Sequence, residues 1–354
     1  HGFSLKIALS EAKKVGATTT KKLGRQTVAL AHPPSVAGHA NVVGKKEGEG
    51  PLADSFDQIN QDDSFGEKTW EKAETAMQKL ALSSALDKAG LSASALDYIL
   101  AGDLLNQCIG SGFAVRGQDV PFFGLCGACS TMAESLSLAA LLLDGGGATH
   151  AAAMTSSHFC SAERQYRTPL EYGGQRTPTA QWTVTGAGCV ILSREGPGPY
   201  ITHVTTGKIV DKGIQDANNM GAAMAPAAYD TIQAHFRDTG RRPSDYDLIV
   251  TGDLGSLGKE ILLDLFHRDG IEFKNLEDCG VLIYDAQTQD VHCGGSGCGC
   301  SAAVLTGFLL NGMKQGRWRR LLFCGTGALL SPTSTLQGES IPSICHAVAI
   351  STEQ

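Results

Sequence analysis

The sequence contains two copies of one pattern, and this duplication restricts the folds that the chain can adopt. The run 100–104, Leu-Ala-Gly-Asp-Leu, returns as Val-Thr-Gly-Asp-Leu at 250–254. A Cys-Ser pair that leads an apolar run to a closing glycine occurs at 129–145 and again at 300–316. The apolar runs 151–156 and 321–326 also correspond. Repetition on this scale indicates that two copies of one supersecondary unit have been fused.

Within each copy the hydrophobic pattern alternates between strands and helices. The first copy predicts a helix over 68–88, strands over 97–103 and 121–125, a helix over 132–143 and strands over 148–155 and 186–193. An earlier strand is expected over 24–30, ahead of a glycine-rich loop at 43–54. This alternation predicts an α/β fold in which each half is a mostly parallel sheet covered by helices.

The boundary between the halves is expected at the run Glu-Gly-Pro-Gly-Pro, residues 195–199. We therefore divide the chain into a mobile extension at 1–20, an N-terminal half at 21–197 and a C-terminal half at 198–354. A functional site is expected where the two halves meet.

Composition excludes several classes of protein. A net charge of -7 without a Lys/Arg run argues against nucleic-acid binding. No run is long and apolar enough for a membrane span, and no signal peptide is visible. The eleven cysteines lie mostly in apolar or glycine-rich runs, which indicates a reducing environment. Cys126 with Cys129, and Cys298 with Cys300, could alternatively be metal ligands or redox pairs.

Cys129 is the candidate nucleophile. It lies in a turn of small residues at the expected start of the helix over 132–143, and Ser130 or Thr131 is expected to cap that helix. A helix N-terminus favours an anion and lowers the pKa of a thiol. The alternative is a buried, inert cysteine that fills space in the turn.

These features resemble the thiolase and ketoacyl synthase superfamily, in which Cys129 would occupy the acyl-accepting position. The resemblance implies a thiolase-like fold with α-β-α-β-α layers. Longer runs resemble one family of that superfamily, the dipicolinate-binding stage V sporulation protein AD family of spore-forming bacteria, from about Lys22 to the C-terminus. The runs that carry this resemblance are 100–107, 155–158, 162–165, 171–175, 221–228 and 325–332.

The sequence departs from the catalytic families of the superfamily at their histidines. Thiolases carry Gly-His-Pro in the second half, and here the matching position of the His is Ser296. No His stands near the second catalytic position, 253–256, which leaves His346 as the nearest substitute base. Because Claisen chemistry needs a base, the resemblance implies that Cys129 is vestigial and that the protein is not an enzyme.

The resemblance implies binding of dipicolinic acid (pyridine-2,6-dicarboxylate), alone or as its calcium complex, and a part in its uptake into developing spores. No cofactor or metal is expected, except calcium carried by the ligand. One alternative is a Cys-dependent, ketoacyl-synthase-like acyltransferase that uses an unrecognised base; another is a scaffold subunit with a vestigial cleft. The expected ligand-binding residues are Cys129, Ser130, Asp103, Asn106, Ser157, His158, Arg164, Ser296, Gly297 and Gly325.

A flat dianion also calls for cations and for space. Arg164, Arg167 and Arg176 are the candidate cations, with solvated loop charges as the alternative reading, and residues 294–299 would provide the space. By resemblance, the partners would be membrane subunits of the spore dipicolinate transport system and a second copy of the chain, which would pair through the first-half sheet. The expected location is the developing spore, peripheral at its inner membrane.

Overall fold

The two halves of the chain form sheets with the same strand order. The computed structural model describes residues 20–166 and 176–354. The first sheet runs β3 (Ser35–Val43), β9 (Gly186–Ser193), β7 (His150–Ser157), β5 (Tyr98–Gly102) and β6 (Phe122–Leu125). The second runs β10 (Tyr200–Thr205), β15 (Ser343–Ser351), β14 (Arg320–Ala328), β11 (Leu248–Thr251) and β12 (Leu276–Asp278).

Strand directions repeat as well as strand order. β9 is antiparallel to both of its neighbours, and so is its counterpart β15. The remaining pairs of these two sheets are parallel: β5 pairs with β7 and β6, and β11 pairs with β14 and β12. The two sheets touch at one register pair, Tyr200 with Ser35, at their β10 and β3 edges. The duplication predicted from the sequence is therefore confirmed in the topology.

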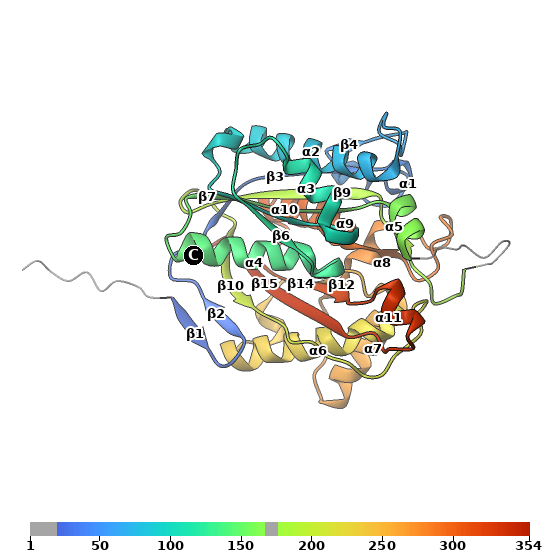
Figure 1. The fold of residues 1–354 in the computed structure, drawn as a ribbon. Coiled ribbons are helices and arrows are strands. Elements are labelled where there is room, and N and C mark those ends of the chain that lie inside the picture. The colour runs from blue at the N-terminus through green and yellow to red at the C-terminus, as the bar shows by residue number, and fades with distance from the viewer. Residues whose placement is uncertain (1–19, 167–175) are drawn as a thin grey trace, which may run out of the picture.

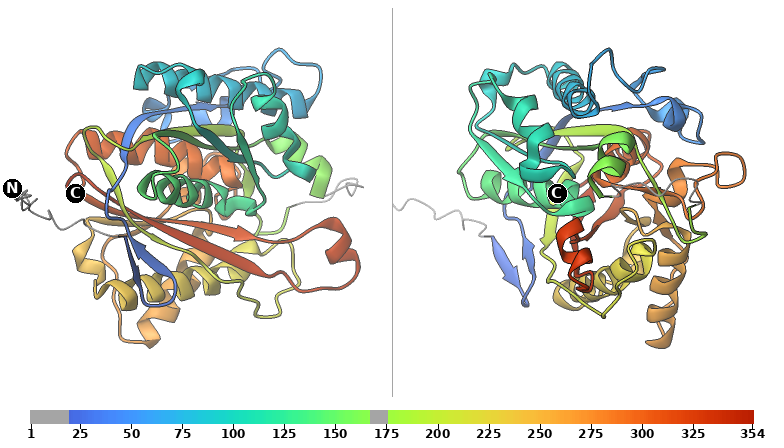
Figure 2. Two further views of the ribbon diagram at one scale, coloured as in Figure 1. Left: turned by 60° about the vertical axis from the view of Figure 1, so that its left-hand side comes forward. Right: turned by 45° about the vertical axis from the view of Figure 1, so that its right-hand side comes forward.

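Helices complete five layers, which Figures 1 and 2 show edge-on. α2 (Trp70–Ala89) and α3 (Ile109–Val115) cover the outer face of the first sheet, and α6 (Met220–Thr239) and α7 (Gly255–Arg268) cover that of the second. Between the sheets lie α4 (Thr131–Asp144) and a continuous helical run of α9 (Cys298–Val304), the π-helix η6 (Leu305–Leu309) and α10 (Leu310–Lys314). The layers follow the predicted order α-β-α-β-α.

The central helices are apolar because both of their faces are buried. Met132, Leu136 and Leu143 of α4 are at most 1% exposed. Small residues allow α9 to approach the first sheet, since a Cβ on Gly188 of β9 would lie 2.6 Å from the carbonyl oxygen of Ala302. The apolar runs that the sequence shows in each half therefore form helices in the core that the two halves share.

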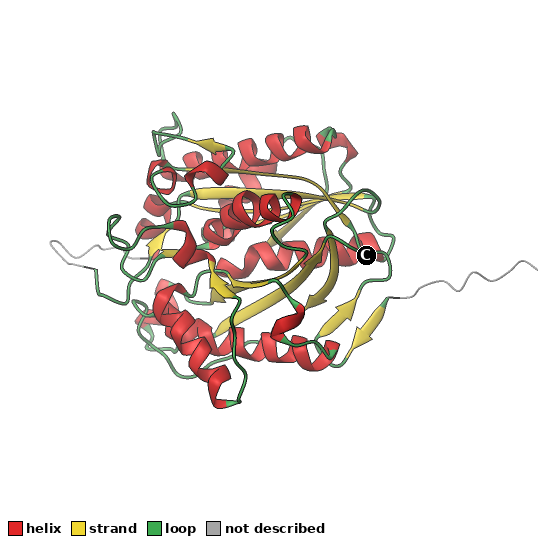
Figure 3. Cartoon of the chain, turned by 180° about the vertical axis from the view of Figure 1, so that it is seen from behind, coloured by secondary structure: helices red, strands yellow, loops and turns green. Residues whose placement is uncertain are grey.

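Short elements connect the layers, as Figure 3 shows. The first-half connections contain β1 (Lys21–Leu23), β2 (Thr27–Ala29), α1 (Lys45–Gly48), η1 (Ala53–Ser55), β4 (Gln58–Ile59), η2 (Ala93–Ala95), η3 (Asn106–Cys108), η4 (Ala128–Ser130), α5 (Phe159–Tyr166) and β8 (Trp182–Thr183). The second-half connections contain η5 (Pro243–Asp245), α8 (Cys279–Ile283), β13 (Gly295–Ser296) and α11 (Pro332–Leu336).

The N-terminal region differs from the sequence prediction. The single strand expected over 24–30 is confirmed only at Thr27–Ala29, because residues 21–29 form the hairpin of β1 and β2, which turns at Gly24 with φ of 54°. β2 pairs with β10, so this part of the first half extends the second sheet. The extension predicted at 1–20 lies, apart from Thr20, outside the described residues.

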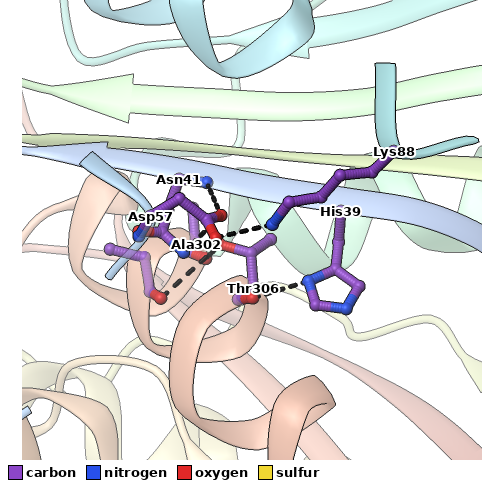
Figure 4. Close-up of polar contacts among 7 residues, drawn as sticks. His39, Asn41, Asp57, Lys88, Ala302 and Thr306 are labelled. Carbon is purple, nitrogen blue, oxygen red and sulfur yellow. Dashed lines mark hydrogen bonds and ion pairs between the residues drawn. The ribbon is translucent and has the colours of Figure 1, made fainter. Parts of the chain in front are cut away.

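A polar cluster fastens the second-half helical run to the first sheet (Figure 4). His39 of β3 bonds through Nδ1 to the carbonyl oxygen of Thr306, at 2.6 Å, inside the π-helix. Burial lowers the pKa of His39 to about 4, so the ring is neutral at pH 7 and donates through Nδ1. Beside it, Lys88 of α2 forms an ion pair with Asp57 at 2.6 Å. The cluster fixes the position of the helical run that begins at the candidate site.

Candidate functional site

Cys129 lies in a tight turn between β6 and the central helix α4. Residues 128–130 form the 3-10 helix η4, and Ala128 in it has a left-handed φ of 51°. A Cβ on Gly327 of β14 would lie 2.5 Å from the carbonyl oxygen of Gly127. The second sheet therefore packs directly against the backbone of the turn, and Cys129 lies where the two halves meet.

The hydroxyl groups that follow Cys129 do not cap α4, contrary to the sequence prediction. Ser130 Oγ donates to the carbonyl oxygen of Gly127 at 2.7 Å, and Thr131 Oγ1 donates to that of Ala128 at 2.6 Å. Both bonds stabilise the turn itself. The helix begins without a side-chain cap.

The second half places a buried carboxylate, Asp253, against the Cys129 sulfur. Asp253 follows β11 and has no exposed surface. Its Oδ2 accepts from the Gly297 amide at 2.9 Å and from Ser296 Oγ at 3.3 Å, and its Oδ1 accepts from Thr326 Oγ1 at 2.9 Å. The Cys129 thiol lies against the same carboxylate and interacts with it. One carboxylate thus joins β11, β14, the start of α9 and the Cys129 turn.

These contacts hold Cys129 as a neutral thiol. Burial raises its pKa well above the ordinary value, and the negative charge of Asp253 raises it further. Burial also raises the pKa of Asp253 to about 6, so the carboxylate is mostly ionised at pH 7. Of the two interpretations offered by the sequence, this favours the buried, inert cysteine over the activated nucleophile, because a helix dipole contributes only about 0.3–1 kcal/mol and is outweighed here.

A pocket of about 270 Å³ opens beside Cys129. Its wall is largely apolar and comes from α5, the start of α6 and the end of β14. This volume lies at the small end of the range for ligand sites, about 300–1,000 Å³, and suits one small molecule. The apolar wall includes Leu104, Ala128, Ala162, Met220, Ala328 and Leu330.

The polar groups of the pocket include no strong base. Among the described lining residues there is no His, Lys or Arg, and the one carboxylate is that of Glu163. Tyr166 and Thr183 add hydroxyl groups, and Asn218 adds an amide. Tyr166 is oriented by its hydroxyl, which donates to the carbonyl oxygen of Leu104 at 2.5 Å. The lining can therefore hold a ligand but offers no imidazole for proton transfer.

Of the residues predicted to bind a ligand, Cys129 and Ser296 line this pocket. Ser130 and Gly297 adjoin them but are turned inward, since the Ser130 hydroxyl is bonded within its turn and the Gly297 amide to Asp253. Gly325 is enclosed: a Cβ there would lie 2.7 Å from the Cβ of Ala133 in α4. These three residues shape the site from behind its surface.

Asp103 and Asn106 have structural partners away from the pocket lining. The Asp103 carboxylate is 4% exposed and accepts from the Leu105 amide at 2.9 Å and from the Ser111 amide at 2.7 Å. It therefore organises the loop between β5 and α3. The backbone amide of Asn106 donates to Gln165 Oε1 at 2.9 Å, which ties the same loop to α5.

Ser157 and His158 are also buried behind the pocket. Ser157 Oγ donates to the carbonyl oxygen of Val184 at 2.6 Å and accepts from the Gly299 amide at 3.1 Å. His158 Nε2 bonds to the carbonyl oxygen of Asp63 at 2.8 Å, and burial lowers its pKa, so the ring is neutral and donates there. Both residues fasten the end of β7 to neighbouring loops.

The candidate cations do not line the pocket in the described part of the chain. Arg164 forms an ion pair with Glu71 of α2, on the outer side of α5. The Arg176 guanidinium lies over the Trp182 ring, 4.7 Å from its centroid. Arg167 lies outside the described residues.

His346, the substitute base considered from sequence, is not among the lining residues either. Its Nδ1 accepts a hydrogen bond from the Gly207 amide at 3.2 Å. Burial lowers its pKa to about 4. It is a neutral, packed histidine of β15.

Sequence reasoning missed Asp253 as a site residue. In the sequence, the run 253–256 is distinguished only by its lack of a His, which gives no sign that the Asp253 carboxylate has a role. The duplication carried the signal, because Asp253 is the repeat counterpart of Asp103 at the end of an equivalent strand. Tyr166 and Glu163 were missed because nothing in the sequence distinguishes the face of α5 that they share with Ala162.

Comparison with known sequences places the chain clearly. The family model for Stage V sporulation protein AD (SpoVAD) matches residues 24–351. The Stage V sporulation protein AD of Bacillus subtilis (strain 168) is 45% identical over 329 residues, which cover 93% of this chain and 97% of that protein.

Solved structures that match this fold include ketosynthases. The 3-oxoacyl-(acyl-carrier-protein) synthase III from Aquifex aeolicus VF5 matches with a TM-score of 0.57 and 15% identity, over 90% of this chain and 99% of that one. Cerulenin-bound OleA of Xanthomonas campestris matches with a TM-score of 0.59 and 14% identity, over 93% and 97%. These likenesses establish the thiolase-like fold that the sequence predicted. With that fold and the sequence match together, the chain belongs to the stage V sporulation protein AD family.

Proposed function

We propose that this sporulation protein is a non-catalytic binding protein, which holds dipicolinate in the pocket beside Cys129 and takes part in its uptake into the developing spore. One observation carries the proposal: the pocket-lining Cys129 is kept as a thiol by burial and by Asp253, and no described lining residue is an imidazole. Acyl transfer through a cysteine needs a thiolate or a base that can form one. The site therefore favours binding over chemistry.

The lining of the pocket favours the calcium complex over free dipicolinate. The wall is largely apolar, and a free dianion that entered it would lose its hydration. A calcium ion held by the two carboxylates of dipicolinate cancels their charge and lowers that cost. In the described part of the chain, no group of three His, Cys, Asp or Glu side chains could hold a metal ion alone. Calcium would thus enter with the ligand.

Calorimetry on the purified chain tests this proposal. Dipicolinate with equimolar calcium should bind, and removal of calcium with a chelator should weaken binding by tenfold or more. Ala162→Leu places three more carbon atoms in the pocket and should also reduce affinity at least tenfold, because it takes up scarce volume. Ala76→Leu is the matched control, since Ala76 lies on α2 in a separate surface hollow.

Other results would contradict the proposal. Absence of heat with both forms of the ligand, at millimolar concentration, would leave the scaffold reading. A stable adduct on Cys129 after incubation with acyl-CoA, seen by mass spectrometry together with turnover, would favour the acyltransferase. Equal affinity in Ala162→Leu and wild type would place the ligand elsewhere.

We also propose that the chain forms a homodimer through the first sheet. β6 ends that sheet, and no described strand pairs with its outer edge. Phe122 and Phe123 on β6 are 37% and 46% exposed, and Ile109 and Phe113 on the neighbouring α3 are each 40% exposed. An unpaired edge beside exposed aromatic rings favours pairing with a second copy. Light scattering on the purified chain should give twice the chain mass of 37.1 kDa; the mass of one chain would contradict the dimer.

The remaining partners are proposed from the family. None of the helices in the described residues is long and apolar enough to cross a membrane. From the family likeness we propose that the protein lies at the surface of the spore inner membrane, held by the membrane subunits of the dipicolinate transport system. Loss of the protein from the membrane fraction when those subunits are deleted would support this placement, and unchanged sedimentation would oppose it.

A further inference from the structure

Two cysteines outside the pocket lie close enough to react with each other. Cys108 Sγ and Cys126 Sγ are 3.3 Å apart, and all eleven cysteines of the chain are free thiols. Cys126 is exposed, whereas Cys108 is 6% exposed. The pair therefore combines a thiol that a soluble oxidant can reach with a second thiol directly behind it.

The backbone holds the two sulfur atoms in this position. Gln107 and Cys108 both have left-handed φ angles, 60° and 51°, which turn the chain sharply before α3. The turn directs the Cys108 sulfur toward the end of β6, where its thiol contacts the carbonyl oxygen of Leu125 at 3.0 Å. Cys126 follows Leu125 directly in the chain. A disulfide of about 2.05 Å requires the sulfur atoms to approach by little more than 1 Å, which side-chain rotation can supply.

The short spacing of Cys126 and Cys129 suggested a different redox pair from the sequence. The two sulfur atoms have different neighbours in the structure: the Cys129 thiol lies against Asp253, and Cys126 faces Cys108. The reactive partner of Cys126 is therefore a residue 18 positions earlier in the chain.

We propose that Cys108 and Cys126 are a redox pair that forms an intrachain disulfide when the protein meets a peroxide. The Cys126 thiol gives up its proton, and the thiolate attacks a peroxide oxygen. The O–O bond breaks, Cys126 becomes a sulfenic acid, and the leaving hydroxide takes up the released proton to form water. The Cys108 sulfur then attacks the Cys126 sulfur, the S–O bond breaks, and the Cys108 proton leaves with the hydroxide as a second water. Two thiols and one hydrogen peroxide thus give one disulfide and two waters.

The surroundings assign the order of the two steps. Burial, together with the neighbouring Cys126, raises the pKa of Cys108 to about 12, so the buried thiol is a poor first nucleophile. The exposed Cys126 reacts first, and Cys108 resolves the sulfenic acid because it is already in contact. This order protects Cys126 from irreversible over-oxidation.

The disulfide would join two segments that line the pocket. Leu104, four residues before Cys108, and Ala128, two residues after Cys126, both belong to its wall. Oxidation would therefore restrain one side of the pocket. The pair itself is defined by its geometry and does not depend on which ligand the pocket holds.

The test uses the full-length purified chain and hydrogen peroxide. After mild oxidation, unfolding and thiol titration, two of the eleven thiols should be lost, and dithiothreitol should restore both. Peptide mass spectrometry should find residue 108 linked to residue 126 within one chain. Cys126→Ser should abolish the loss, whereas Cys108→Ser should lose at most the Cys126 thiol and form no disulfide. Cys160→Ser, which changes another partly exposed thiol, should still lose two thiols.

Three results would overturn the proposal. One is a peptide that links Cys126 to Cys129, and another is a disulfide between two chains on a non-reducing gel that disappears in Cys126→Ser. The third is accumulation of sulfinic acid on Cys126 with no disulfide, which would mean that Cys108 cannot resolve the oxidised thiol. Circular dichroism of each variant separates these outcomes from misfolding.

Discussion

Replacement of Asp253 by asparagine should make Cys129 at least ten times more reactive toward iodoacetamide at pH 7. In the native chain the Cys129 pKa is raised first by burial and then by the Asp253 carboxylate. The substitution keeps the burial and removes the negative charge beside the sulfur. Each unit by which the pKa falls is worth about 1.36 kcal/mol and increases the thiolate fraction tenfold. Mass spectrometry of the alkylated Cys129 peptide over time measures the rate.

Asp278→Asn is the matched control for this experiment. Asp278 is also fully buried in the second half, with a pKa raised by burial to about 7, but its contacts are with Thr251, Leu254 and Gly255. Its loss should leave Cys129 labelling unchanged. Equal labelling of Asp253→Asn and wild type would mean that burial alone suppresses Cys129, and that Asp253 serves the fold without controlling the thiol.

The fold was predictable where the sequence repeats itself. The matching runs at 100–104 and 250–254 are β5 and β11 with the residues that follow them, and both strands are parallel to their neighbours in equivalent positions. The apolar runs 132–143 and 302–310 are central helices because both pack into the core that lies between the two sheets. Such features are encoded locally, in the period and length of apolar runs.

The features that sequence reasoning missed depend on contacts between distant residues. β3 was not predicted because its sequence, Ser-Val-Ala-Gly-His-Ala-Asn-Val-Val, mixes polar and small residues; it is a strand because β9 pairs along its length. The β1–β2 hairpin pairs with β10, nearly 180 residues later in the chain. Local pattern does not determine which sheet a short strand will join.

The candidate site was predictable in position and less so in membership. The Cys129 turn and Ser296 follow from family motifs, and the structure brings both to one pocket. Polar residues at strand ends are candidate ligand-binding residues, and Asp103, Ser157 and His158 are of this kind. Buried amide and carbonyl groups of the nearby loops also need hydrogen-bond partners, however, and these three side chains supply them. The same position in the second half, Asp253, does reach the site. Sequence alone does not reveal which of two equivalent carboxylates meets the cysteine.

Gly299→Ala should destabilise the chain by about 3 kcal/mol, a large share of the 5–15 kcal/mol that is typical of folded proteins. Gly299 lies in α9, where a Cβ would be 2.3 Å from the carbonyl oxygen of Gly186 and 2.7 Å from the backbone nitrogen of Ser157. Both contacts are with backbone atoms of the first sheet, which cannot turn away as a side chain can. The urea midpoint, followed by circular dichroism, should therefore fall steeply.

Gly112→Ala isolates this packing effect from helix propensity. Gly112 lies in α3, and a Cβ there would meet no atom within 4 Å. Both substitutions gain the same preference of alanine for helices, so Gly112→Ala should be neutral or stabilise the chain by up to about 1 kcal/mol. If the two substitutions change the free energy of unfolding in opposite directions, the difference comes from the contact of α9 with the first sheet. If Gly299→Ala unfolded at the wild-type urea concentration, α9 could move away from that sheet without cost, and the Gly297 amide that holds Asp253 beside Cys129 would not be fixed by packing.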